Sequence, residues 1–141
     1  MKKQATIYNY NEIAIDSTFS FTRTVTKKDV SAFATLSGDF NPLHVDDNFG
    51  KNSKFGKNVV HGMLTASLLS TLVGMYCPGE RCLYLGQTLQ FKMPLFYDET
   101  VDVKGTVISK VNAFKMLKIK TEIYRGKDLI LTGEAQVQLL G

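Results

Sequence analysis

Residues 61–76 form the most apolar segment of the sequence, and they constrain the fold more than any other feature. Apart from His61 at the start of the segment, no side chain before Tyr76 is ionisable. The segment is long enough for a helix of roughly 24 Å with apolar side chains on most of its faces. Since such a helix needs cover on more than one side, we expect it to be buried.

Several other segments alternate apolar and polar side chains with a period of two, which is the pattern of half-buried strands. In the last of them, leucine, alanine and valine alternate with threonine, glutamate and glutamine. One solvent-exposed face and one apolar face are typical of antiparallel sheets. The pattern predicts five strands, near residues 19–25, 84–91, 101–107, 117–123 and 129–139.

Short local signals connect and cap these elements. Residues 125–128, Arg-Gly-Lys-Asp, are favourable for a hairpin, and residues 112–113, Asn-Ala, form a weaker connection. Thr26, followed three residues later by Asp29, is a variant of the capping box and predicts a helix over residues 27–37.

The predicted sheet has one apolar face, and one flat sheet does not cover a helix that is apolar nearly all round. The simplest solution is an α+β fold in which the antiparallel sheet curls around the helix. The length of 141 residues is that of one domain. We therefore expect a single domain over residues 1–141, with residues 1–18 as an irregular N-terminal segment.

The charge and hydropathy patterns exclude several classes of function. The net charge of +4 is mild, and the lysines and arginines are spread along the chain instead of forming a nucleic-acid-binding block. No run of eighteen apolar residues predicts a membrane span, and the polar N-terminal residues do not form a signal segment. We therefore expect a cytoplasmic protein that binds neither nucleic acid nor membranes.

The cysteines and one lysine cluster give little support for a metal or cofactor site. Cys77 and Cys82 lack the companion ligands of a zinc site, so we expect reduced thiols and no metal. Lys51, Lys54 and Lys57 lie in a stretch with glycine and asparagine. They either meet the phosphates of a small molecule or are simply solvated. We predict no cofactor.

Residues 38–58 lose all periodicity, and a long irregular stretch in a small domain is more often functional than idle. Near its start, Asn41 and Pro42 stiffen the path between a carboxylate, Asp39, and an imidazole, His44. Alone, Asp39 is well explained by an Asx-type turn and His44 by a structural histidine. The two groups in one stiff turn favour acid–base catalysis.

Gly62 adds a third element at the start of the apolar segment. A helix N–H in the first turn has no intrahelical acceptor, and a glycine lets a carbonyl oxygen approach it. A glycine needed only for close packing is the alternative reading. Together with Asp39 and His44, an oxyanion donor suits hydration or dehydration of an enoyl thioester, where a proton moves at the α carbon and water adds at the β carbon. Such a reaction needs no metal or redox cofactor.

Residues 37–46, Ser-Gly-Asp-Phe-Asn-Pro-Leu-His-Val-Asp, resemble the signature of the MaoC-like (R)-specific enoyl-CoA hydratases. Residues 60–64 and 84–94 resemble further segments of the short bacterial members of this family, and the resemblance covers roughly residues 19–140. It implies a hot-dog fold, in which an antiparallel sheet wraps a long helix and two copies pair edge to edge. It also implies that the motif loop overhangs an acyl-thioester tunnel.

The resemblance further implies roles for single residues. Asp39 and His44 would be the catalytic dyad that holds the water, and Gly62 would bind the thioester carbonyl. Asn41 would support the dyad, and Ser70 matches a polar position near it. The expected activity is (R)-specific hydration of trans-2-enoyl-CoA to (R)-3-hydroxyacyl-CoA, and the reverse dehydration. The expected partners are an acyl-CoA substrate, of which coenzyme A is a part, and a second copy in a homodimer or dimer-based oligomer.

Three other activities stay open from the sequence. A 3-hydroxyacyl-[acyl-carrier-protein] dehydratase needs the same dyad and differs in the surface that receives the carrier. A hot-dog thioesterase would direct water at the thioester carbonyl, and the spacing of Asp39 and His44 argues against it. A noncatalytic acyl-thioester-binding module would have lost turnover, although Asp39, His44 and Gly62 are all present.

Overall fold

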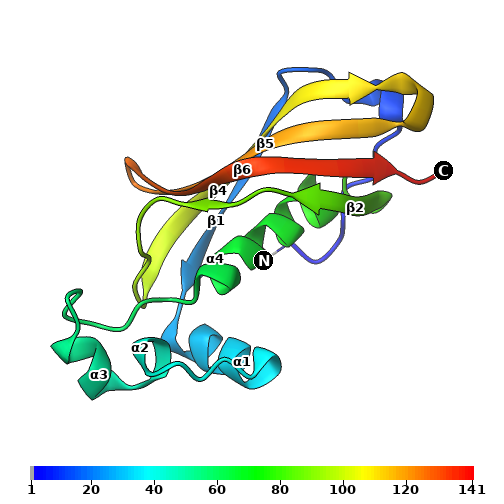
Figure 1. The fold of residues 1–141 in the computed structure, drawn as a ribbon. Helices are drawn as coiled ribbons and strands as arrows, with labels where there is room; N and C mark the ends of the chain where they lie inside the picture. The colour runs from blue at the N-terminus through cyan, green and yellow to red at the C-terminus, as the bar shows by residue number, and fades with distance from the viewer. Residues whose placement is uncertain (1) are drawn as a thin grey trace.

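The computed structural model describes residues 2–141, and its largest element is an antiparallel sheet (Figure 1). The order of the strands is β1-β4-β5-β6-β2, and a short strand, β3, pairs with β6. Five strands were predicted and six are present. The strands are β1 Thr18–Val25, β2 Cys82–Gln87, β3 Gln90–Phe91, β4 Glu99–Val111, β5 Met116–Arg125 and β6 Asp128–Leu139.

The predicted strand over residues 84–91 is two strands, because its pairing with β6 is interrupted. The register shifts between Tyr84 and Gly86. Beyond β2 the backbone of Thr88 crosses Gly133, where a Cβ would lie 1.8 Å from the carbonyl oxygen of Thr88. Gly133 thus provides the room for this crossing, and regular pairing resumes at Gln90.

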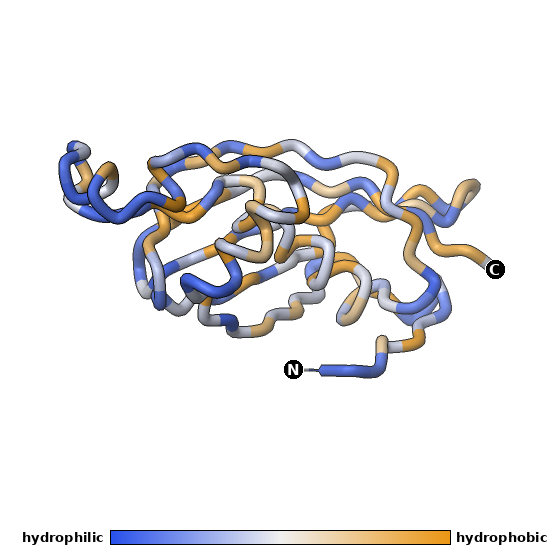
Figure 2. The backbone as a smooth tube through the Cα atoms, turned by 90° about the horizontal axis from the view of Figure 1, so that it is seen from below, coloured by the Kyte–Doolittle hydropathy of each residue, from blue (hydrophilic) through white to orange (hydrophobic). Residues whose placement is uncertain are grey.

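The sheet curls around the helix α4, Gly62–Thr71, which continues as a π-helical turn over Leu72–Tyr76 (Figure 1). This confirms both the helix and the curled sheet expected from the sequence. Leucines 68, 69 and 72 pack into one core cluster with residues of β1, β4, β5 and β6. The alternation of hydrophobic and hydrophilic residues along the strands is visible in Figure 2.

The apolar helix, which was expected to be buried, is exposed on one face. Met63 is 58% exposed, and Ser67 and Ser70 are also exposed. The reason is that the sheet of one chain covers only the face with Thr65, Ala66, Leu68 and Leu69. Met63 is the large apolar side chain that this face leaves exposed.

The segment between β1 and α4 is more ordered than predicted. The helix α1, Lys27–Ser37, has the predicted bounds and the predicted capping box between Thr26 and Asp29. Residues 38–58, expected to be irregular, contain two short helices, α2 Pro42–Val45 and α3 Asp47–Asn52. Each forms because an Asx side chain caps it: Asn41 accepts from the N–H of Leu43, and Asp46 accepts from the N–H of Phe49.

The N-terminal residues pack against the far half of the core. Residues 2–17 hold a short 3₁₀ turn, Tyr10–Glu12, and an isolated bridge from Ile7 to Gly79, and are otherwise irregular. Tyr10 and Ile13 are buried in a second core cluster with residues of β4, β5 and β6. None of the helices in residues 2–141 has the length and hydropathy that a membrane span requires.

Candidate active site

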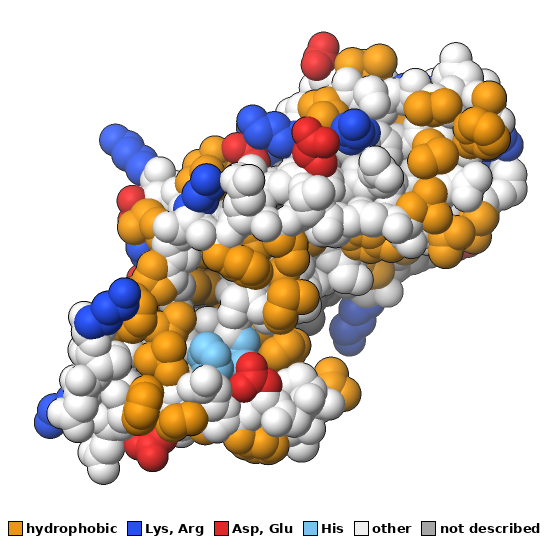
Figure 3. Space-filling view, in the orientation of Figure 1, with side chains coloured by type: hydrophobic (Ala, Val, Ile, Leu, Met, Phe, Trp, Pro, Cys, Tyr) orange, Lys and Arg blue, Asp and Glu red, His pale blue; other side chains and the backbone are white. Residues whose placement is uncertain are grey.

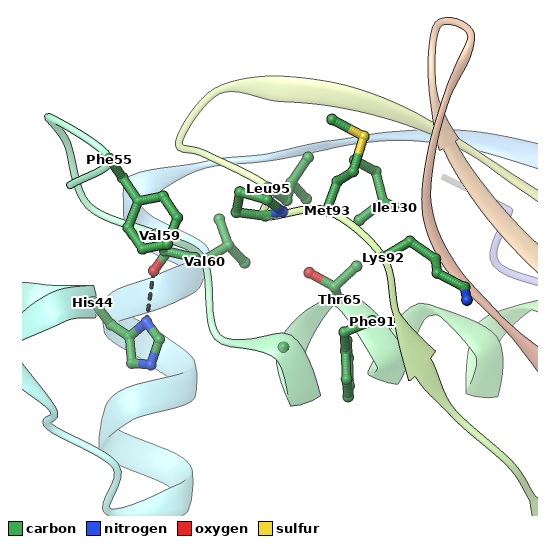
Figure 4. A pocket seen from close by; sticks show the side chains of 12 residues that line it. His44, Phe55, Val59, Val60, Thr65, Phe91, Lys92, Met93, Leu95 and Ile130 are labelled. Atoms are coloured by element: carbon green, nitrogen blue, oxygen red, sulfur yellow. Dashed lines mark hydrogen bonds between the residues drawn. The ribbon is translucent and has the colours of Figure 1, made fainter.

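His44 lies on α2 and is fixed by both its backbone and its ring. The side chain of Asn41 caps α2, and the hydroxyl of Tyr97 donates to the carbonyl of His44. The ring Nδ1 lies 2.6 Å from the carbonyl oxygen of Val59 (Figure 4). A carbonyl oxygen only accepts, so Nδ1 carries the hydrogen and Nε2 carries the lone pair of the neutral ring. Nε2 is therefore the nitrogen of His44 that can take a proton.

Asp39 follows α1, which ends at Gly38 with a left-handed φ of 79°. Its Oδ1 accepts from the N–H of Asn41 at 3.1 Å, so the Asx-turn reading of the sequence applies. The carboxylate is 50% exposed. One carboxylate oxygen of Asp39 and one ring nitrogen each of His44 and His61 lie within 4.8 Å of one another. The turn thus brings the predicted acid and base together, as the stiff motif suggested.

His61 joins this cluster, and the sequence analysis did not predict a role for it. Its ring stacks on that of His44, with centroids 4.0 Å apart and an interplanar angle of 27°. Its Nε2 lies 2.9 Å from the carbonyl oxygen of Asp39. A signal was present in the composition: the chain has two histidines, and both belong to this cluster.

Gly62 is the first residue of α4, so its N–H has no intrahelical acceptor. A Cβ at this position would lie 3.0 Å from Cε1 of Phe91, closer than ordinary contacts allow. The two readings of the sequence, an oxyanion donor and a glycine needed for packing, are therefore both compatible with the geometry. They make different predictions for substitution, which are developed below.

A cavity of about 290 Å³ is lined by His44 and Gly62. In Figure 3 the histidine side chains lie in a hollow between the sheet and the segment α1–α3, with hydrophobic side chains around them. In Figure 4, His44 lies on one side of the start of α4, and Thr65 and Phe91 lie together on the other side. Besides His44 and Gly62, the lining residues are Phe55, Val59, Val60, Thr65, Phe91, Lys92, Met93, Pro94, Leu95 and Ile130. A mostly apolar wall with a few polar groups suits an acyl thioester.

Asn58 is a further residue that the sequence analysis missed. It is buried, and its Nδ2 donates to the carbonyls of Leu43 at 3.0 Å and Asp46 at 2.8 Å. The N–H of Val59 also donates to the carbonyl of Leu43. These bonds tie the α2 helix to the strand-like segment that leads into α4, and so they hold His44 over the cavity.

Ser70, which the resemblance implies to lie near the dyad, does not line this cavity in the single chain, so its supporting role stays a prediction. It follows Gly62 by eight residues on α4, about 12 Å along the helix axis, and it is exposed. The polar helix side chain that lines the cavity is Thr65, which is 2% exposed. Thr65 is one turn after His61, and one turn is the spacing that keeps a side chain on the same face.

Asp39, His44 and His61 are also the side chains most suited to hold a metal ion. A ligating imidazole nitrogen needs a free lone pair. Nε2 of His61 faces the carbonyl of Asp39, and Nδ1 of His44 faces that of Val59, so both donate. The remaining lone pairs are those of the Asp39 carboxylate, of Nε2 of His44 and of the buried Nδ1 of His61. That the protein needs no metal or cofactor stays a prediction.

Of the three lysines clustered in the sequence, Lys54 contacts a residue that lines the cavity. Nζ of Lys54 is 5.1 Å from the ring centroid of Phe55, which lines the cavity. Nζ of Lys57 is 4.3 Å from the ring centroid of Phe96. A cation beside the cavity suits a substrate that carries phosphates outside the cavity.

The two thiols, Cys77 and Cys82, are free and lie apart from this site. Burial raises the pKa of Cys77 to about 12, with a further contribution from Cys82, and burial raises the pKa of Cys82 to about 11. Thiols in this state are poor nucleophiles at neutral pH. They are not catalytic candidates.

Comparison with known proteins identifies a family. The MaoC-like domain matches residues 10–126 of the chain. An (R)-specific enoyl-CoA hydratase of Aeromonas caviae is 44% identical over 112 residues, which cover 79% of this chain and 84% of the relative. A mitochondrial 3-hydroxyacyl-[acyl-carrier-protein] dehydratase of Solanum lycopersicum is 33% identical over 132 residues, with 92% of this chain and 79% of the relative covered.

A solved structure gives the same result for the fold. The (R)-hydratase of A. caviae involved in PHA biosynthesis superposes with a TM-score of 0.88 at 38% sequence identity. The match covers 91% of this chain and 98% of that structure. The curled antiparallel sheet around α4 is therefore a hot-dog fold, as the resemblance implied.

Proposed function

Since the chain belongs to the MaoC-like domain family, we propose that it is a hydro-lyase that adds water to trans-2-enoyl-CoA and forms (R)-3-hydroxyacyl-CoA. The same site runs the reverse dehydration. The observation that carries this proposal is that His44 and the helix start at Gly62 line one apolar cavity, while a carboxylate oxygen of Asp39 lies within 4.8 Å of a ring nitrogen of His44.

His44 acts on the water in this proposal. Its Nε2, left unprotonated by the Nδ1 contact with Val59, takes a proton from the water as the oxygen bonds to the β carbon. The electrons of the double bond move toward the α carbon and the carbonyl oxygen. Asp39 relays a proton to the α carbon on the same face, and the dyad shares its protons as one coupled unit.

Gly62 stabilises the charge that develops on the carbonyl oxygen. Its N–H belongs to the positive end of α4 and has no acceptor within the helix. One such donor typically contributes about 3 kcal/mol to the transition state. The glycine also leaves space at the wall shared with Phe91, where a thioester must pass.

The test is direct. Crotonyl-CoA is added to the purified protein, and the loss of the absorbance of the conjugated enoyl thioester is followed in time. We expect loss of absorbance without release of free thiol, and an (R)-3-hydroxy product on chiral analysis. Thiol release would instead indicate a thioesterase. An unchanged spectrum across chain lengths, in both directions, would indicate a noncatalytic binding module and contradict the proposal.

A dehydratase acting on acyl-carrier-protein substrates is the second candidate, because the Solanum lycopersicum relative carries that name. The chemistry at the dyad is the same, so only the carrier differs. Equal concentrations of crotonyl-CoA and crotonyl-acyl-carrier protein separate the two. We expect the larger kcat/KM with the CoA thioester, since the cation of Lys54 beside Phe55 suits its phosphates.

We also propose that the chain forms a homodimer through β2 and α4. β2 is the last strand in the sheet order, and its outward side chains Leu83 and Leu85 are 43% and 47% exposed. An unpaired edge with apolar side chains favours pairing with a second copy. Light scattering during size-exclusion chromatography is expected to give twice the mass of the chain. Leu85→Lys, on this edge, is expected to shift the population toward the monomer.

A further inference from the structure

His61 has no step in the mechanism above, although it is the most buried member of the cluster. It is 2% exposed and directly precedes α4 as its N-cap. Its ring centroid lies 4.9 Å from that of Phe33 on α1 and 4.0 Å from that of His44 on α2. One buried ring therefore contacts three elements, α1, α2 and α4, that border the site.

The polar contact of this ring is directed at the backbone of Asp39. Nε2 lies 2.9 Å from the Asp39 carbonyl oxygen, which only accepts, so Nε2 carries the hydrogen. The carboxylate Oδ2 of Asp39 is 4.0 Å from the same nitrogen, beyond hydrogen-bond distance. Nδ1 of His61 has no hydrogen-bond partner among residues 2–141. The ring thus makes one hydrogen bond, and that bond fixes the peptide that carries the catalytic acid.

We propose that His61 is the positioning residue of the dyad and holds Asp39 and His44 at a fixed place relative to the N–H of Gly62. This inference rests on the hydratase function proposed above. The three groups come from three chain segments: the link after α1, the helix α2 and the start of α4. His61 bonds to the first, stacks on the second and is covalently joined to the third.

The need for such a residue follows from the exposure of Asp39. Its carboxylate is half exposed, and its hydrogen bond is to the nearby N–H of Asn41, which moves with the same loop. A local contact of this kind does not place the loop relative to α4. A misplacement of about 1 Å in a catalytic group costs on the order of 10²-fold in rate. His61 provides a direct hydrogen bond from the N-cap of α4 to the backbone of Asp39.

Three substitutions separate positioning from simple filling of space. His61→Gln places an amide N–H near the position of Nε2 and keeps the bond to Asp39. His61→Asn carries the same amide one methylene shorter, so it cannot reach the Asp39 carbonyl. His61→Phe keeps an aromatic ring against His44 and removes the donor. The purified variants are compared in crotonyl-CoA hydration, with the midpoint of thermal unfolding measured for each.

We expect kcat to fall about 10²-fold in His61→Asn and His61→Phe, with KM within about threefold, and to stay within about tenfold in His61→Gln. Rescue by glutamine is the signature of positioning, because a residue needed only for packing is replaced better by phenylalanine. If phenylalanine preserves kcat, or if glutamine is as damaging as asparagine, His61 is not the positioning residue.

A second measurement does not depend on activity. The N–H of Asn41 donates to Oδ1 of Asp39, so its hydrogen exchange reports the order of the Asp39 turn. We expect faster exchange at Asn41 in His61→Asn and His61→Phe than in the wild type, and little change in His61→Gln. Equal exchange in all four proteins overturns the positioning role. An inactive wild type with the expected exchange pattern would instead reject the hydratase function alone.

Discussion

Gly62→Ala tests whether the start of α4 is an oxyanion donor or merely a close packing contact. The added Cβ would lie 3.0 Å from Cε1 and 3.3 Å from Cδ1 of Phe91, whereas ordinary contacts begin at 3.4 Å. Phe91 must therefore withdraw by a few tenths of an ångström. Its ring is 51% exposed, so it can move at little cost. We expect the free energy of unfolding to change by less than about 1 kcal/mol, since alanine is also a better helix former than glycine.

The activity is expected to change far more than the stability. The new methyl group occupies the space through which a carbonyl oxygen reaches the N–H of Gly62. Blocking access to this donor removes about 3 kcal/mol of transition-state stabilisation, which lowers kcat for crotonyl-CoA by about 10²-fold. The assay is steady-state hydration by the purified variant, with the unfolding midpoint as the control for the fold.

Phe91→Ala completes the test as a double-mutant cycle. If Gly62 acts as the donor, Gly62→Ala lowers kcat by the same factor whether or not the Phe91 ring is present. If the glycine is needed only to make room for the ring of Phe91, Gly62→Ala does not lower kcat in the Phe91→Ala background. Recovery of activity in the double variant would refute the oxyanion role, and so would a near-wild-type kcat in Gly62→Ala.

Three further outcomes follow from the packing and the pKa shifts. Asn58→Ala leaves the carbonyls of Leu43 and Asp46 without their donor, so it is expected to lower the free energy of unfolding in urea by about 2 kcal/mol and to reduce kcat. An unchanged midpoint of urea unfolding would contradict this. Burial raises the pKa of Asp29, but its hydrogen bonds to Thr26 and its ion pair with Arg23 together lower the pKa by more than burial raises it, so the pKa lies below its ordinary value. The stability that Asp29 contributes is present above the ordinary pKa of 3.8 and is lost as the pH falls below this value. Thr26→Ala should lower the free energy of unfolding by about 1 kcal/mol at neutral pH and make it depend less on pH in acid. If the free energy of unfolding falls with pH equally in the variant and the wild type, Asp29 does not cause the acid dependence. Because burial raises the pKa of Cys77 to about 12 and that of Cys82 to about 11, alkylation at pH 8 should be much slower in the folded protein than in urea, and equal rates would count against buried thiols.

The sequence predicted the elements that depend on local chemistry. The helix α1 was bounded correctly because its capping box lies in consecutive residues, and the hairpin at residues 125–128 joins β5 to β6 as expected. The curled sheet followed from the apolar segment, since a helix of that kind needs cover. The short helices in residues 38–58 were missed because their Asx caps are also ordinary turn residues.

Only the part of the candidate site that depends on neighbouring residues was predicted from the sequence. Asp39 and His44 are five residues apart, so their proximity is a local property of one turn. His61, Asn58 and Tyr97 reach them from other segments, and no spacing in the sequence reveals a contact made by tertiary packing. Ser70 was assigned by a resemblance, and the rise of the helix carries it away from the cavity in the single chain.

The dyad is the central claim, and Asp39→Asn with His44→Ala tests it most directly. Asparagine keeps the shape of Asp39 but cannot relay a proton, and alanine removes the nitrogen that takes a proton from water. Crotonyl-CoA hydration is measured for both purified variants beside the wild type, with circular dichroism as the check on the fold. We predict that each folded variant loses at least about 10²-fold in kcat while the wild type forms the (R) product. Near-wild-type turnover in either folded variant would contradict the dyad.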